Sequence, residues 1–126
     1  MSGMRVGSIA WFDLTVDNTE EVRDFYKEVV GWDHSDVDMD GYADYNMTEP
    51  GTDTTAAGIV HRRGINADIP PQWMIYIMVA DLDASVAAVE RLGGKVVKRG
   101  KDMPYAIIQD PAGAVAGLMQ MPEEGG

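Results

Sequence analysis

An apolar strand followed by an amphipathic helix occurs twice in this 126-residue chain, and the second copy begins 63 residues after the first. The matched positions carry residues of the same character. They are Leu14 with Ile77, Val16 with Val79, Asn18 with Asp81, Tyr26 with Val89, and Gly31 with Gly94. An internal repeat of this length indicates that the fold consists of two copies of one structural unit.

Each copy predicts one helix and four strands. Alternation of apolar and polar residues predicts the strands, and apolar residues at helical spacing predict the helices. The expected strands cover residues 8–16, 32–39, 42–48, 54–61, 73–80, 95–101, 104–109 and 114–121. The expected helices follow Asn18 and Asp81, and the Asp40-Gly41 pair predicts a tight hairpin turn.

The first helix carries the clearer signals. Asn18 or Thr19 can cap its start, and Glu21 stands where the acidic residue of a capping box would be. Its apolar residues fall at i, i+3, i+4 and i+7 and should pack on the sheet as one stripe. These residues are Val22, Phe25, Tyr26 and Val29.

The element order predicts an α+β fold. Two βαβββ modules cover about residues 7–63 and 72–121, a linker covers about 64–71, and together they form one domain over residues 1–126. One helix covers one face of each four-stranded sheet, so the other face must be buried against something, most economically the other module. We therefore expect curved mixed sheets around a cleft.

The composition excludes several classes of function. A formal net charge of −11 argues against a nucleic-acid partner and against attraction to membrane surfaces. The sequence contains no apolar run long enough to span a bilayer and no signal-peptide pattern, so we expect a cytoplasmic protein. The absence of cysteine excludes disulfides, thiolate nucleophiles and Cys-ligated zinc.

The sequence resembles the vicinal oxygen chelate superfamily, whose members include glyoxalase I, extradiol dioxygenases, methylmalonyl-CoA epimerase and bleomycin resistance proteins. Three segments carry the resemblance, which covers about residues 8–121. They are Phe25-Tyr26 with Gly31-Trp32, Leu92-Gly93-Gly94-Lys95, and Asp110-Pro111-Ala112-Gly113. The chain looks most like the short glyoxalase-like members, and the resemblance implies two βαβββ modules and a homodimer.

The resemblance also implies four metal-ligand positions, because metal-using members supply a histidine from the first strand and a glutamate from the last strand of each half. These positions hold Trp11, Gly58, Met74 and Gly117 in this sequence. Indole and glycine offer no side-chain lone pair, and a thioether does not suit zinc, iron or magnesium. We therefore expect no metal and no other cofactor.

The residues around these positions predict a pocket for a small, largely apolar ligand. Trp11, Gly58, Met74, Met78 and Gly117 would leave a roomy apolar space, with Tyr105 and Gln109 at its polar rim. Asp13 and its counterpart Tyr76 are the candidates for acid–base chemistry, since burial would raise the pKa of Asp13. Alternatively, Asp13 is a structural carboxylate that backbone amides or the Tyr76 hydroxyl satisfy.

The sequence also allows alternative roles for His61 and for the chain as a whole. His61 is expected to be a solvated surface histidine, with a general base as the alternative. The chain would sequester its ligand or act on it. It could instead be a lyase, isomerase or dioxygenase that binds metal through unusual ligands, or a regulatory module without chemistry.

Overall fold

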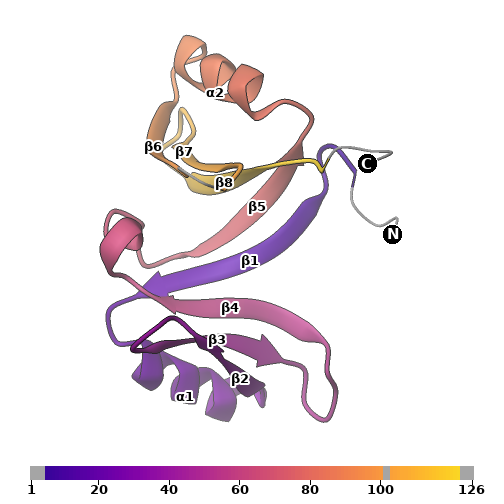
Figure 1. The fold of residues 1–126 in the computed structure, drawn as a ribbon, viewed down its shortest axis with the longest axis vertical. Helices are drawn as coiled ribbons and strands as arrows, with labels where there is room; N and C mark the ends of the chain where they lie inside the picture. The colour runs from indigo at the N-terminus through magenta and orange to yellow at the C-terminus, as the bar shows by residue number, and fades with distance from the viewer. Residues whose placement is uncertain (1–4, 101–102, 123–126) are drawn as a thin grey trace. The chain divides into compact units, whose positions relative to one another are not determined.

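A computed structural model describes residues 5–100 and 103–122 of the chain. It contains two α-helices, eight strands and one short 3-10 helix (Figure 1). The strands are β1 (Ile9–Val16), β2 (Asp33–Asp38), β3 (Ala43–Thr48), β4 (Thr55–His61), β5 (Trp73–Val79), β6 (Lys95–Arg99), β7 (Tyr105–Gln109) and β8 (Val115–Gln120). The helices are α1 (Thr19–Val30), α2 (Leu82–Arg91) and η1 (Gly64–Asn66).

This element order confirms the predicted α+β fold of two βαβββ modules. All eight predicted strands are present, and residue 101 of the predicted strand 95–101 lies outside the described residues. The hairpin turn is confirmed as well, because Asp40 and Gly41 both have positive φ and Met39 N donates to Tyr42 O at 2.8 Å. No helix in the described ranges is long and apolar enough to cross a membrane.

The chain forms two compact units, which we call the N-terminal module (Phe12–Trp73) and the C-terminal module (Met1–Trp11 with Met74–Gly126). In the N-terminal module the strand order is β2-β3-β4-β1, with β1 parallel to β4 and the other neighbours antiparallel. Helix α1 packs on one face of this sheet. The core between them contains Leu14, Val16, Tyr45, Met47 and Ile59, with Val22, Tyr26, Trp32 and Ala43 packed against it.

The C-terminal module repeats this topology. Its strand order is β5-β8-β7-β6, with β5 parallel to β8 and the other neighbours antiparallel. Near its start the chain pairs with β5, because Gly7 N donates to Met78 O and Met78 N donates to Ser8 O. Helix α2 covers one face of the sheet. The core there contains Leu82, Ala106 and Leu118, with Ile77, Val79, Val86, Val89 and Ile108 packed against it.

The expected packing of α1 is correct for only half of its stripe. Val22 and Tyr26 pack on the core, but Phe25 is 56% exposed and Val29 is 59% exposed. Residues at i and i+4 share the line that faces the sheet, whereas Phe25 lies to one side of it. There the Phe25 ring packs edge-on against the Tyr26 ring, with the two centroids 5.1 Å apart.

Asn18 is the N-cap residue of α1, as expected, but its side chain does not cap the helix. Asn18 has φ −103° and ψ 60°, a conformation in which its side chain caps no backbone amide. Its Nδ2 instead donates to Glu21 Oε1 at 3.0 Å, and the Thr19 hydroxyl donates back to Val16 O. In α2, by contrast, Asp81 is an extended N-cap whose carboxylate accepts from Ala84 N at 3.1 Å.

Candidate functional site

The face of each sheet that its helix does not cover, which we call the helix-free face, carries the predicted site residues. Side chains alternate between the two faces along a strand. Because Ile77 and Val79 pack in the core with α2, residues Met74, Tyr76 and Met78 of β5 belong to the helix-free face.

The strand register extends this face across the C-terminal module. Tyr76 lies opposite Gly117 and Gly117 opposite Ile107, so one row crosses β5, β8 and β7. The next row contains Met78, Met119 and Tyr105. The helix-free face of this module therefore carries methionine, tyrosine and isoleucine.

Two tyrosines on this face each cover a glycine. A Cβ atom added to Gly117 would lie within 3.0 Å of three atoms of the Tyr76 ring, and one added to Gly100 would meet the Tyr105 ring. The predicted open space beside Gly117 is therefore filled by Tyr76. Each of these two rings therefore lies directly against the backbone of a glycine.

The matching face of the N-terminal module is polar. Asp13 lies opposite Gly58, Gly58 opposite Asn46, and Asn46 opposite Ser35, so this row crosses all four strands. Asp13 and Tyr76 thus occupy equivalent places in the two modules, each paired with one of the glycines at a predicted metal position. Thr15, two residues further along β1, is buried on the same face.

His61 is not the solvated surface residue that we expected, because only 14% of its side chain is exposed. Its Nδ1 lies 3.0 Å from Oδ1 of the buried Asp44, and its Nε2 lies 3.3 Å from Glu20 Oε2. Tyr45 donates its hydroxyl to the same Glu20 oxygen at 2.9 Å. The cluster links the start of α1 to β3 and β4.

This cluster shifts two pKa values. Backbone hydrogen bonding at the start of α1, and then the Tyr45 hydroxyl, lower the pKa of Glu20. Burial, and then the hydrogen bond to Glu20, raise the pKa of Tyr45. Both shifts keep Glu20 ionised and Tyr45 protonated, which preserves their hydrogen bond.

The donor set at the four predicted metal positions does not fit the superfamily's metal site. Trp11, Gly58, Met74 and Gly117 supply no carboxylate and no imidazole. Within residues 5–100 and 103–122, no group of three or more His, Cys, Asp or Glu side chains is placed to hold a metal ion.

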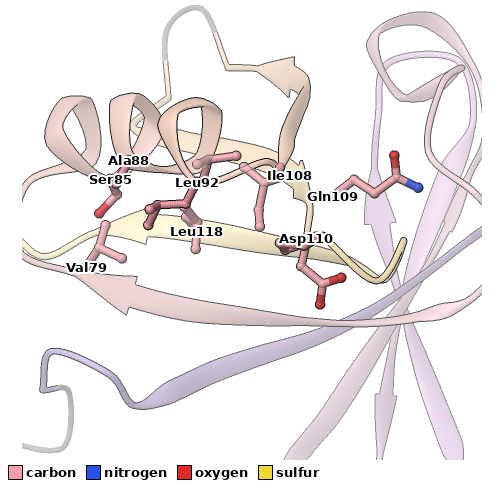
Figure 2. A pocket seen from close by; sticks show the side chains of 11 residues that line it. Val79, Ser85, Ala88, Leu92, Ile108, Gln109, Asp110 and Leu118 are labelled. Atoms are coloured by element: carbon pink, nitrogen blue, oxygen red, sulfur yellow. The ribbon is translucent and has the colours of Figure 1, made fainter.

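A cavity of about 330 Å³ lies between α2 and its sheet in the C-terminal module (Figure 2). Its walls are mainly aliphatic, with three polar side chains. It is lined by Val79, Ser85, Ala88, Val89, Leu92, Gly94, Ile108, Gln109, Asp110, Pro111 and Leu118. Of the residues predicted to line the ligand pocket, Gln109 alone is among them, because the cavity is on the helix-covered face.

The N-terminal module has an aromatic pocket of about 260 Å³, lined by Phe12, Trp32, Ala56, Ala57 and Trp73. Trp73 Nε1 donates to the Tyr26 hydroxyl at 3.0 Å, and the two indole rings meet edge-on with centroids 6.0 Å apart.

A sequence model of the Glyoxalase/Bleomycin resistance protein/Dioxygenase superfamily matches residues 8–116 of the chain. The chain belongs to this superfamily. The match covers both modules, and it confirms the resemblance on which the four metal positions were assigned.

Relatives of this superfamily member differ in role. The anthracycline biosynthesis protein DnrV of Streptomyces peucetius is 32% identical over 120 residues, which is 93% of this chain and 42% of that protein. CFP32 of Mycobacterium bovis, whose name provisionally assigns it as a glyoxylase, is 28% identical over 118 residues, which is 90% of this chain and 44% of that protein. The chain therefore spans less than half the length of these curated relatives.

Among solved structures, methylmalonyl-CoA epimerase from Mycobacterium tuberculosis superposes with a TM-score of 0.55. The two sequences are 17% identical, and the superposition covers 97% of this chain and 93% of that chain. At this identity the likeness establishes the fold of the superfamily member but not its function. Its chemistry has to be inferred from its own residues.

Proposed function

We propose that this superfamily member binds a small, largely apolar ligand on the helix-free face of its C-terminal module, without a metal ion. The observation that carries the proposal is the replacement of the donor set. At the four positions that the resemblance assigns to the ligands of metal-using members, this chain has Trp11, Gly58, Met74 and Gly117. A polarising metal is replaced by surfaces that favour contact with apolar groups.

The helix-free face of the C-terminal module offers aromatic contacts. The Tyr76 and Tyr105 rings, each against a glycine, offer aromatic area at a low cost in side-chain entropy. Met74 and Met78 belong to the same face but are almost fully buried, at 1% and 3% exposed, so the two tyrosine rings carry the proposed contacts. Asp13, on the N-terminal module, is tested separately as a candidate for acid–base chemistry or for a charged contact.

The relative DnrV suggests the first ligand class to test. DnrV is named for anthracycline biosynthesis. The aglycone of an anthracycline is a flat polycyclic aromatic body, and its amino sugar makes the whole molecule larger and more polar than the ligand class proposed above. The flat body suits contact with aromatic rings, and the cationic amino sugar suits a protein of net charge −11. Daunorubicin is a practical probe, because its own fluorescence reports binding.

The test is a fluorescence titration of the purified chain with daunorubicin. Tyr76→Ala should weaken binding by about tenfold or more, since stacking on one aromatic ring contributes about 1–3 kcal/mol. Tyr42→Ala is the matched control, because Tyr42 contacts His61 and Arg63 rather than the helix-free face of the C-terminal module. Equal affinities for the two variants would refute a site at Tyr76.

Asp13→Asn separates sequestration from acid–base chemistry. If the chain only sequesters its ligand, this variant keeps the binding free energy that comes from the aromatic rings and loses only the binding free energy that comes from the charge. If the bound molecule is converted to product and Asp13→Asn stops the conversion, Asp13 serves as a proton-transfer group. Unchanged binding and unchanged conversion would remove Asp13 from the site.

A further inference from the structure

The cavity under α2 results from small residues in the second copy of the repeat. Ser85 matches Val22 of α1, and Val89 matches Tyr26. In the N-terminal module, Val22 and Tyr26 pack against the core. The shorter side chains of α2 cover the same area of sheet without filling it, and this leaves about 330 Å³ between helix and sheet.

The chemistry of the walls defines what the cavity could accept. Val79, Val89, Ile108 and Leu118 give it branched aliphatic sides, and Leu92, which also lines it, is 68% exposed (Figure 2). An apolar cavity of about 150 Å³ in another protein stays dry and binds benzene. A cavity of this size would accept roughly ten to twelve carbon atoms.

A turn fixes two polar side chains at one edge of the cavity. Asp110 Oδ1 accepts from Ala112 N at 2.8 Å and from Ala114 N at 3.0 Å, and Gln109 Nε2 donates to Gly113 O at 3.1 Å. Of the described residues that line the cavity, Asp110 alone is charged. Together with the net charge of −11, this favours a cationic head group and disfavours an anionic one.

We propose that the cavity under α2 is a second ligand site, which binds a compact aliphatic molecule bearing an ammonium group. The aliphatic body lies between α2 and the sheet, and the head group faces Asp110. The site lies on the opposite face of the sheet from Tyr76 and Met78, so it is independent of the function proposed above.

Three probes with the same cage test the head-group preference: 1-aminoadamantane, 1-adamantanol and 1-adamantanecarboxylate. We expect the amine to bind about tenfold more tightly than the carboxylate, with the alcohol between them, and the methyl NMR signals of Val79, Ile108 and Leu118 to shift on titration. A carboxylate that binds as tightly as the amine, or wild-type methyl signals that do not respond, would overturn the proposal.

Ala88→Leu fills the cavity, and Ala87→Leu is its matched control, because Ala87 is exposed on the same helix and does not line the cavity. We expect Ala88→Leu to weaken amine binding by about tenfold or more and Ala87→Leu to leave it within about twofold. Undiminished binding to Ala88→Leu would contradict the site.

Asp110→Asn provides a second test that does not depend on Ala88→Leu folding. Asparagine keeps the oxygen that accepts from Ala112 and Ala114, so the turn is retained while the charge is lost. The amine should then lose its advantage over the alcohol. An unchanged preference would exclude Asp110 as the head-group partner, and daunorubicin titration of the same variants reports separately on the helix-free face.

Discussion

The N-terminal and C-terminal modules place different side chains at matched positions of the same sheet topology. On the helix-free face, Asp13 in one module corresponds to Tyr76 in the other, and each pairs with a glycine. Under the helices, Tyr26 fills the interface in one module, whereas Val89 leaves a cavity in the other. The repeat therefore preserves the backbone pairing while the two modules specialise in different chemistry.

The largest expected effect is a difference in stability between substitutions in the two helix–sheet interfaces. Tyr26→Ala should lower the free energy of unfolding by about 3 kcal/mol, because it removes a ring from the core and the acceptor of the Trp73 indole. Val89→Ala should cost only about 1 kcal/mol, because Val89 already faces a cavity. Urea denaturation measures both, and equal costs would show that the interfaces are packed alike.

The second prediction concerns the glycine under Tyr76. Gly117→Ala should lower the free energy of unfolding by about 2 kcal/mol, because the new methyl group would collide with the ring. In a Tyr76→Ala background the same change should be neutral or stabilising, since alanine is favoured over glycine in a strand interior. An additive double-mutant cycle would be incompatible with the ring lying over Gly117.

The helix starts provide a third, smaller contrast. Asp81→Ala should cost about 1 kcal/mol, because it removes the cap on Ala84 N. Asn18→Ala should cost only a few tenths of a kcal/mol, because the Asn18 side chain contacts Glu21 instead of a backbone amide. Thermal unfolding of the two variants resolves the difference. A larger loss of stability for Asn18→Ala than for Asp81→Ala would show that the Asn18 side chain, and not that of Asp81, is the stronger helix cap.

The smallest expected effect is a pH dependence in the N-terminal module. The folded state lowers the pKa of Glu20. Ionised Glu20 therefore stabilises the folded state above the unfolded pKa of about 4.5, and this stabilisation is lost as the pH falls through the folded pKa. Because Glu20 is more than half exposed, the contribution is a few tenths of a kcal/mol.

The free energies of unfolding of wild type and Glu20→Gln should therefore converge as the pH falls below about 4.5. Tyr45→Phe should reduce the pH dependence, because it removes the hydroxyl that helps to lower the pKa of Glu20. A pH-independent difference between wild type and Glu20→Gln would contradict the assigned cause.

Sequence periodicity was sufficient to predict the secondary structure, because alternation and helical spacing are local properties. It did not reveal which side of α1 the sheet covers, so Phe25 and Val29 were wrongly assigned to the interface. The burial of His61 depends on Asp44 and Glu20, which are distant in sequence and come together only in the folded module.

The candidate site was predictable to a different degree. The equivalence of Asp13 and Tyr76 followed from the repeat, and the strand register agrees with it. The cavity under α2 was missed, although the pairs Val22 with Ser85 and Tyr26 with Val89 were visible in the alignment of the two copies. The smaller side chains of α2 at these matched positions were the sequence signal that could have predicted the cavity.

The absence of a metal from the proposed site is tested most directly by elemental analysis. The chain would be produced in medium supplemented with zinc, nickel, iron and manganese, and then dialysed without a chelator. The account predicts far less than one equivalent of any of these metals per chain, because Trp11, Gly58, Met74 and Gly117 cannot replace the superfamily's ligands. One tightly held metal ion per chain would contradict it.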